Sequence, residues 1–157
     1  MPKAAVGRKV PQFRAQATGG RTVSSRDLKG HPYVLYFYPK DSTPGCTAEG
    51  QDFRDRYEEF RRHGIEIFGV SRDSLDSHEK FRQKQGFAFD LISDPEESLC
   101  ALFDVIKEKN LYGRKHMGIE RSTFLVDADG VLREEWRKVK VKGHVENVLE
   151  AARSLDV

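Results

Sequence analysis

The sequence predicts a single α/β domain, residues 1–157, with a mixed central sheet, flanking helices and an N-terminal β extension. Two apolar and aromatic runs, 33–38 and 65–70, are separated by a stretch whose apolar residues have helical spacing. A connection of this length between two buried strands is typical of a right-handed βαβ unit, in which the strands pair in parallel. Near the C-terminus, the turn signal 127–130 between the expected strands 122–126 and 131–142 indicates an additional antiparallel pair.

The N-terminal quarter of the chain is expected to begin with a loose tail, residues 1–9. Residues 10–17 alternate modestly between apolar and polar side chains and lead into the turn 18–21, which indicates two short strands. Residues 24–28 fit one capped helical turn. The run 33–38 is apolar or aromatic throughout and lies between two prolines, which describes a strand buried on both faces.

The middle of the chain is expected to alternate helices and strands. Residues 44–63 place small or apolar side chains on one helical face, and Gly64 ends that helix. Residues 65–70 form the second buried strand. A second helix is expected over 76–85, and 89–92 form a short strand at the edge of the sheet.

The last third of the chain supplies the remaining helices and the antiparallel pair. Residues 94–103 begin with an N-cap aspartate, a proline and two acids, which predicts a helix. The basic stretch 107–115 is expected to be a solvated loop. Strands over 122–126 and 131–142 are followed by a helix over 144–154. The order βαβ, linking helix, ββα predicts a thioredoxin-like arrangement.

Composition excludes several classes of protein. The chain has 157 residues and is 38% hydrophobic, which suits one globular domain and argues against intrinsic disorder. The 27 Lys and Arg against 25 Asp and Glu leave a net charge of +2, so no nucleic-acid partner is expected. Five scattered histidines show no zinc-ligand spacing, and no metal or other cofactor is expected.

No membrane association is expected from the sequence. No apolar run approaches the roughly 18 residues of a spanning helix. The basic residues near the N-terminus are not followed by the apolar stretch of a secretory signal. With two cysteines in the whole chain, a reducing compartment and a cytoplasmic location are the expectation.

The sharpest functional candidate is Cys46. It lies in the first turn of the expected helix, directly after a buried parallel strand, and open α/β sheets bind their ligands at this end of their strands. A free cysteine has a pKa of about 8.5 and is only a few per cent thiolate at neutral pH. The unpaired N–H groups and the dipole of a helix N-terminus favour the reactive thiolate. The alternative interpretation is a small apolar residue at the start of the buried helix face.

Thr43 stands three residues before Cys46, where a dithiol oxidoreductase would have the first cysteine of Cys-x-x-Cys. Disulfide exchange by a vicinal pair is therefore excluded. A hydroxyl at this place can hydrogen bond to the sulfur and to whatever the sulfur attacks. An ordinary loop or N-cap hydroxyl is the alternative.

The pattern Pro39-x-x-x-Thr43-x-x-Cys46 resembles the active-site motif of the peroxiredoxins. Three longer strings resemble the bacterioferritin comigratory protein, or peroxiredoxin Q, subfamily; they are 36–47, 107–113 and 118–125. The similarity spans roughly residues 6 to 155. It implies a thiol peroxidase in which the cysteine thiolate attacks a hydroperoxide, releases water or an alcohol, and becomes a sulfenic acid.

The resemblance also implies a role for each matching residue. Cys46 corresponds to the peroxidatic cysteine, and the hydroxyl of Thr43 orients the peroxide. Pro39 shields the site from water. Arg121 stabilises the thiolate and polarises the peroxide, and Glu49 is an acid often found beside this arginine. Without the resemblance, Arg121 would be interpreted as a solvated arginine at the start of a strand.

The chain departs from many relatives in how the sulfenic acid would be reduced. A resolving cysteine often follows five residues after the peroxidatic one, where this chain has Gln51, or lies in the next helix near Arg82, where it has none. Only Cys100 remains. Packing as a buried hydrophobe is the favoured interpretation, while resolution within the monomer and an intermolecular bridge stay open.

The favoured cycle therefore uses one cysteine and an external reductant, which could be thioredoxin, glutaredoxin or a small thiol. A monomer is favoured because no long exposed apolar segment requires a partner. Two rival functions remain. One is a thiol–disulfide oxidoreductase on the same fold, and the other is a peroxide-sensing or chaperone-like protein that uses the same thiol.

Overall fold

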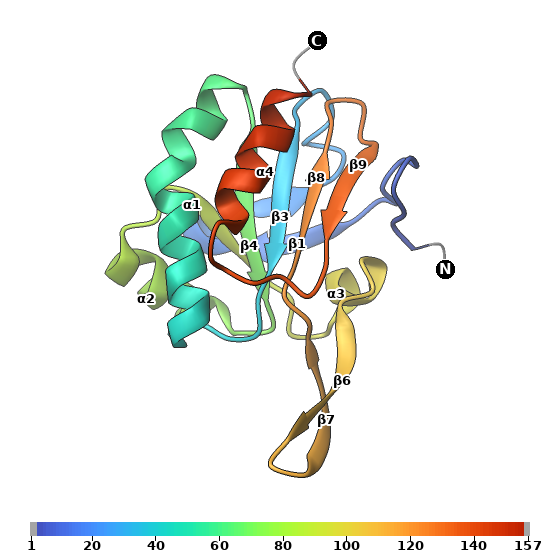
Figure 1. The fold of residues 1–157 in the computed structure, drawn as a ribbon. Coiled ribbons are helices and arrows are strands. Elements are labelled where there is room, and N and C mark those ends of the chain that lie inside the picture. The colour runs from blue at the N-terminus through green and yellow to red at the C-terminus, as the bar shows by residue number, and fades with distance from the viewer. Residues whose placement is uncertain (1–2, 156–157) are drawn as a thin grey trace.

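A strand that is buried along its whole length, β3 (Tyr33–Phe37), runs through the middle of the molecule (Figure 1). The computed structural model describes residues 3–155. The main sheet has seven strands in the order β2-β1-β5-β4-β3-β8-β9. Its other strands are β1 (Arg14–Ala17), β2 (Thr22–Ser24), β4 (Glu66–Ser71), β5 (Asp90–Ser93), β8 (Ser122–Val126) and β9 (Leu132–Trp136).

The sheet is mixed, which confirms the predicted fold class. Strands β3, β4 and β5 are mutually parallel, whereas β1, β2, β8 and β9 are antiparallel to their neighbours. Strand β5, expected at the edge of the sheet, lies inside it because β1 of the N-terminal extension pairs with its outer side. The extension therefore protects a strand edge that would otherwise be open.

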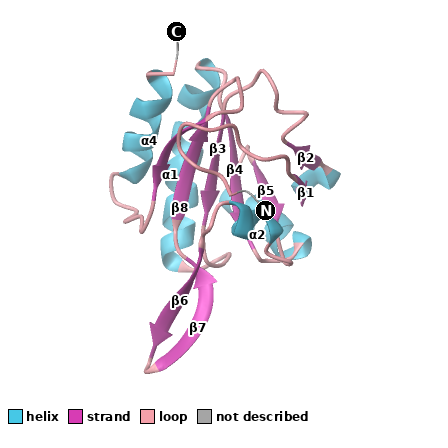
Figure 2. Ribbon diagram, turned by 90° about the vertical axis from the view of Figure 1, so that its right-hand side faces the viewer, coloured by secondary structure: helices cyan, strands magenta, loops and turns pink. Residues whose placement is uncertain are grey.

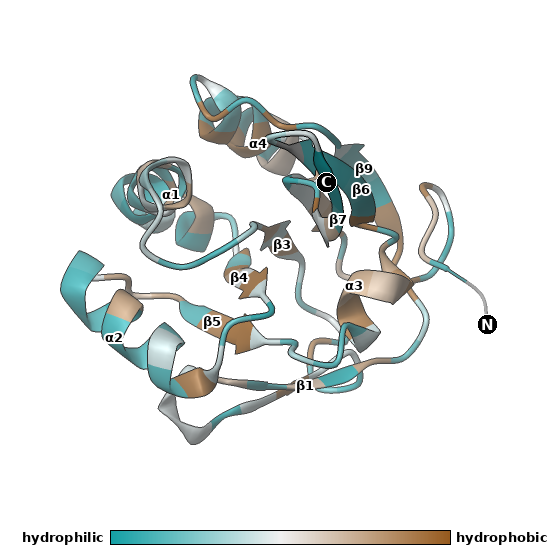
Figure 3. Cartoon of the chain, turned by 90° about the horizontal axis from the view of Figure 1, so that it is seen from below, coloured by the Kyte–Doolittle hydropathy of each residue, from teal (hydrophilic) through white to brown (hydrophobic). Residues whose placement is uncertain are grey.

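Helices cover both faces of the sheet, which explains why β3 is apolar throughout. Helices α1 (Pro44–Arg62), α2 (Leu75–Gln85) and α4 (His144–Arg153) pack on one face, and the short α3 (Ser98–Leu102) lies on the other (Figure 3). Side chains of β3 alternate between the two cores. Tyr36 belongs to the α1 core, and its neighbour Phe37 belongs to the α3 core.

The helix expected over 94–103 is shorter than predicted, because α3 begins only at Ser98. Asp94 still caps it, but from a distance. Its carboxylate accepts the backbone N–H groups of Leu99 at 3.1 Å and Cys100 at 2.7 Å, and the chain between adopts a left-handed turn at Glu97, with φ of 63°.

The basic stretch 107–115, expected to be a loop, forms most of a separate hairpin of β6 (Ile106–Leu111) and β7 (Arg114–Ile119). Figures 1 and 2 show this hairpin projecting from the body of the domain. Its two-residue turn has φ of 52° at Tyr112 and 78° at Gly113, which fits the twist of paired strands. Tyr-Gly is a weaker turn signal than Asn-Gly, so the sequence pattern did not reveal the hairpin.

The strand expected over 131–142 also ends early. Strand β9 stops at Trp136, and residues 137–142 form no regular strand. Arg137 leaves the sheet to donate hydrogen bonds to the carbonyl groups of Phe103 and Asp104, at 2.9 and 2.8 Å. These tertiary contacts hold Arg137 where the sequence analysis expected the strand to continue.

The described part of the expected N-terminal tail, residues 3–9, is fastened to the domain. The backbone N–H of Ala4 donates to the carbonyl of Leu102 at 2.9 Å, and that of Gly7 donates to Leu132 at 2.8 Å. Lys9 forms an isolated β-bridge with Val131. Within residues 3–155, none of the helices combines the length and apolar character needed to cross a membrane.

Candidate active site

Cys46 lies in the first turn of α1, just beyond the carboxyl end of β3. Thr43 is the N-cap residue and Pro44 occupies the first turn, where a missing N–H costs no helical hydrogen bond. The Thr43 hydroxyl does not cap the helix; it donates to the Lys40 carbonyl at 2.8 Å. The Thr43 hydroxyl therefore accepts none of the backbone N–H groups at the helix start, and the Cys46 thiol lies beside them.

Arg121 reaches Cys46 because of the sheet order. It immediately precedes β8, which pairs antiparallel with β3 so that Ser122 lies opposite Phe37. The start of one strand is thus next to the end of the other. Arg121 Nη2 donates to Cys46 Sγ at 3.5 Å, and Nη1 donates to Glu49 Oε1 at 2.6 Å.

Glu49 lies one helical turn after Cys46, on the same face of α1, and its side chain is fully buried. Burial raises the pKa of Glu49 to about 7, although the neighbouring Arg121 acts in the opposite direction. The second carboxyl oxygen, Oε2, has no hydrogen-bond partner among the described residues. The arginine is therefore shared between a thiol and an acid that titrates near neutral pH.

Gly45 is a site residue that the sequence analysis did not identify. A Cβ atom at this position would lie 3.1 Å from Arg121 Nη2, closer than ordinary packing allows. The absence of a side chain lets the guanidinium approach the start of α1. The Pro-Gly pair before Cys46 signalled only a loop.

Lys109 is a second such residue, and it belongs to the stretch that was expected to be solvated. It is half-buried on β6, and a Cβ at Gly118 would lie 3.4 Å from its Cδ. Burial lowers the pKa of Lys109, the positive Arg121 lowers it further, and Cys46 acts in the opposite direction. The hairpin thus brings a third charged side chain into the electrostatic surroundings of Cys46.

The structure brings three of the six candidate residues into contact, places two more in the preceding loop and separates the sixth. Pro39 and Thr43 flank the loop before Cys46, while Glu49 and Arg121 contact the thiol or each other. Cys100 lies apart, because Cys46 belongs to the core under α1 and Cys100 to the core on the other face of the sheet. Burial, followed by a hydrogen bond with Asp94, raises the pKa of the Cys100 thiol.

Comparisons with known proteins agree with this geometry. The AhpC/TSA family model matches residues 6–135. Peroxiredoxin Bcp of Xanthomonas campestris is 56% identical over 137 residues, which cover 87% of this chain and 86% of that protein. Peroxiredoxin Bcp of Bacillus subtilis is 49% identical over 150 residues, which cover 96% of each.

Solved structures give the same result. Xanthomonas campestris peroxiredoxin Q superposes with a TM-score of 0.87 at 54% identity, over 90% of each chain. A second structure, of the bacterioferritin comigratory protein of that organism in a study of alkyl peroxide reduction, has a TM-score of 0.88 at 52% identity, over 92% of each chain. The chain therefore belongs to the AhpC/TSA family and, within it, to the Bcp or peroxiredoxin Q group of thiol-dependent peroxidases.

Proposed function

We propose that Cys46 is the peroxidatic residue of this peroxidase and that the protein reduces hydrogen peroxide and organic hydroperoxides. One observation carries the assignment: the Arg121 guanidinium bridges the sulfur of Cys46 and the buried carboxyl group of Glu49. A cation at 3.5 Å can stabilise the negative charge of an attacking thiolate and can also hold a peroxide oxygen. The alkyl peroxide reduction studied in the Xanthomonas relative supports organic hydroperoxides as substrates.

In the proposed first step, the Cys46 thiolate attacks one oxygen of the hydroperoxide. A sulfur–oxygen bond forms, the oxygen–oxygen bond breaks, and the sulfur loses two electrons as it becomes a sulfenic acid. The departing oxygen takes a proton and leaves as water or an alcohol. Arg121 stabilises the charge that develops on this oxygen, the Thr43 hydroxyl orients the peroxide, and Pro39 shields the site from water.

In the proposed second step, an external thiol attacks the sulfenic acid, releases water and forms a mixed disulfide. A second thiol equivalent frees the Cys46 thiol and leaves as a disulfide. Thioredoxin, glutaredoxin or a small thiol could supply these equivalents. The position of Cys100 in the opposite core supports this one-cysteine cycle, because a disulfide needs Cα atoms within about 7 Å.

We also infer that the protein acts as a monomer in the cytoplasm. Two free cysteines suit a compartment in which thiols stay reduced. Among residues 3–155, the exposed large hydrophobic residues do not come from one segment: Val6 is in the N-terminal extension, Leu75 begins α2, and Tyr112 and Met117 are in the β6–β7 hairpin. Light scattering at micromolar concentration should give the mass of one chain, and a dimer mass would contradict this inference.

The decisive experiment compares Cys46→Ser with Cys100→Ser. With dithiothreitol as reductant, we expect Cys46→Ser to abolish sustained peroxide consumption and Cys100→Ser to retain a large part of it. After one equivalent of peroxide without thiol, dimedone should label Cys46 of the wild-type protein.

Other outcomes would replace this function or its cycle. Sustained turnover by Cys46→Ser would refute the assignment of the nucleophile. Formation of a disulfide removes two hydrogens, so the oxidised chain would be about 2 Da lighter than the reduced chain. Such a species in the wild-type protein, and its absence from Cys100→Ser, would demonstrate a two-cysteine cycle. A single stoichiometric reaction without turnover would favour a peroxide sensor.

A further inference from the structure

The loop that leads to Cys46 contains a buried carboxylate, Asp41, that the proposed chemistry does not use. Asp41 is 6% exposed, whereas its neighbours Lys40 and Ser42 are exposed. A buried carboxylate is costly unless hydrogen bonds satisfy it. The partners of Asp41 therefore show what holds this loop in place.

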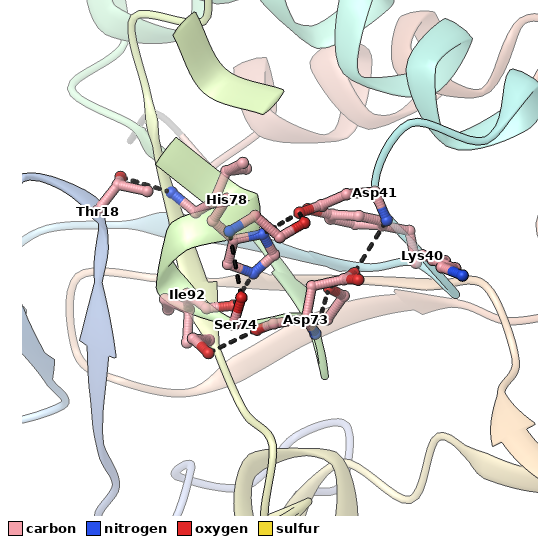
Figure 4. Close-up of polar contacts among 12 residues, drawn as sticks. Thr18, Lys40, Asp41, Asp73, Ser74, His78 and Ile92 are labelled. Atoms are coloured by element: carbon pink, nitrogen blue, oxygen red, sulfur yellow. Dashed lines mark hydrogen bonds and ion pairs between the residues drawn. The ribbon is translucent and has the colours of Figure 1, made fainter. Parts of the chain in front are cut away.

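Both carboxyl oxygens of Asp41 have partners from the protein (Figure 4). The Tyr38 hydroxyl donates to Oδ1 at 2.6 Å, and the Ser77 hydroxyl donates to Oδ2 at 2.8 Å. His78 Nδ1 also lies 2.7 Å from Oδ2. Since Ser77 and His78 are in the first turn of α2, these contacts attach the loop to that helix.

His78 links the loop further, to the central sheet. The ring is completely buried, and its other nitrogen, Nε2, lies 2.9 Å from the carbonyl oxygen of Ile92 in β5. A carbonyl oxygen can only accept, so Nε2 carries a hydrogen, and Nδ1 is left to share a proton with Asp41. Both nitrogens are thus used, and the ring orientation is fixed from two sides.

The backbone of the loop is held as well. The Asp41 N–H donates to Asp73 Oδ2 at 2.9 Å, and the Ser71 hydroxyl donates to the same oxygen at 2.5 Å. Ligand-type atoms of Asp41, Asp73 and His78 lie within 4.8 Å of one another. Because these atoms already hydrogen bond to protein groups, we interpret the cluster as a hydrogen-bond network and not as a metal site.

The loop needs such support because its next residue is strained. Ser42 has φ of 64°, a left-handed conformation that costs energy for a residue with a side chain and persists only where the surroundings impose it. Thr43 follows at once, and Cys46 lies three residues further on. The network therefore ends where the proposed peroxide-binding groups begin.

We propose that Asp41 and His78 are positioning residues for peroxide reduction. They fasten the active-site loop to α2 and β5, and so hold Thr43 in the geometry of attack. Neither residue contacts the reacting sulfur. The inference rests on the proposed function of Cys46 and adds a requirement that the loop be held from the side of α2.

The first test compares His78→Leu with His78→Asn. Leucine removes both hydrogen bonds, whereas the asparagine amide can occupy the place of Nδ1 and keep the bond to Asp41. We expect His78→Leu to slow oxidation of Cys46 by hydrogen peroxide by about 10- to 100-fold, since small misplacements of reacting groups have effects of this size. His78→Asn should recover most of this loss.

Two readouts separate positioning from a general structural defect. The pH dependence of Cys46 alkylation by iodoacetamide should be unchanged in both variants, because Arg121 and the start of α1 remain. Reduction of the sulfenic acid by dithiothreitol should also be unchanged. Oxidation within twofold of wild type in a folded His78→Leu protein would overturn the proposal.

A milder pair of variants covers the case in which His78→Leu does not fold. Ser77→Ala removes one hydrogen bond to Asp41, and Ser74→Ala removes the N-cap bond of the same helix without touching Asp41. We expect slower peroxide oxidation in Ser77→Ala and a wild-type rate in Ser74→Ala. A wild-type rate in Ser77→Ala would contradict the proposal.

Hydrogen exchange tests the loop independently of catalysis. In Ser77→Ala, the amide hydrogens of residues 40–43, 45 and 46 should exchange faster than in Ser74→Ala, because the loop has lost a hydrogen bond that holds it. Unchanged exchange would refute the positioning role. This measurement decides the inference even if the wild-type protein fails to consume peroxide, an outcome that would refute the proposed function instead.

Discussion

The two cysteines of this chain are almost equally buried, yet their surroundings differ in every other respect. Cys46 is 2% exposed and Cys100 is 0% exposed. Cys46 begins a helix of 19 residues, and a guanidinium group lies 3.5 Å from its sulfur. Cys100 lies in the middle of a five-residue helix beside the carboxylate of Asp94. Accessibility alone would not distinguish a nucleophile from a packing residue here, whereas the sign of the neighbouring charge does.

The backbone reinforces this difference. At Cys46, the Thr43 hydroxyl leaves the helix start uncapped, so the positive end of α1 acts on the sulfur. At Cys100, Asp94 caps α3 through the Cys100 N–H itself, at 2.7 Å, and so places a negative charge beside the thiol. The carboxylate that caps α3 thus helps to raise the pKa of the Cys100 thiol, whereas Cys46 has a cation and an uncapped helix start beside it.

The largest expected effect comes from removing the charge that distinguishes the two thiols. Arg121→Ala should slow peroxide reduction by about 10²- to 10³-fold, the usual consequence of losing one positioned charged donor. Alkylation of Cys46 by iodoacetamide should then require a higher pH. Arg133→Ala, which removes an exposed arginine paired with Asp127, serves as control and should change neither measurement. An unchanged alkylation profile in Arg121→Ala would mean that the cation does not act on the thiol.

The next effect concerns the acid beside that arginine. Because burial raises the pKa of Glu49 from 4.5 to about 7, the folded protein favours the protonated carboxyl group. The contribution of the protonated Glu49 carboxyl group to the free energy of unfolding is therefore complete below pH 4.5, and it is lost as the pH rises through 7. Glu49→Gln stays neutral and can still accept from Arg121. Relative to this variant, wild type should lose about 3 kcal/mol of unfolding free energy over that interval.

Urea unfolding of both proteins at several pH values measures this difference. A stability difference that is independent of pH would show that Glu49 ionises as a solvated carboxyl group does. His144, whose pKa is lowered to about 4 by burial, is common to both proteins, so its titration does not enter the comparison.

A smaller effect tests how closely the arginine approaches Cys46. In Gly45→Ala the new Cβ would lie 3.1 Å from Arg121 Nη2, so the guanidinium must move. We expect peroxide reduction to slow by about tenfold, within the range that displaced reacting groups produce. In the background of Arg121→Ala the same substitution should have little further effect. Additive losses in the double variant would show that Gly45 acts by another route.

The smallest effect is expected on the Cys100 side. Cys100→Ala removes one buried sulfur from a core with Phe37 and Phe103, so unfolding should become easier by about 1 kcal/mol. Peroxide consumption with dithiothreitol should remain at the wild-type level. A loss of turnover without loss of stability would give Cys100 a chemical role.

Local patterns predicted the parts of the fold that are decided locally. The apolar run of β3, the one-sided spacing of α1 and Gly64 after that helix place β3 and α1 correctly. The position of Cys46 at a helix start follows from the same patterns. The start of α3 was predicted too early, because Asp94 caps across a left-handed residue that no short motif signals.

The contacts that complete the site depend on chain segments far apart in sequence. Arg121 is 75 positions from Cys46, and only the pairing of β8 with β3 brings them together. The family resemblance supplied that residue, and local spacing could not. Lys109, Gly45 and the pairing of Asp41 with His78 were missed for the same reason. Each depends on which surfaces meet after the sheet has formed.

The sheet between the two sulfurs has a kinetic consequence. A resolving cysteine in the same chain would make removal of the sulfenic acid a first-order step that releases water and forms a disulfide, and external thiol would then reduce that disulfide. In the one-cysteine cycle proposed here, the sulfenic acid forms in the core under α1 while the other thiol lies behind the strands. Removal of the sulfenic acid is then itself bimolecular, so its rate rises with the supply of reductant, and the steady-state fraction of protein held as sulfenic acid records the local balance between peroxide and thiol.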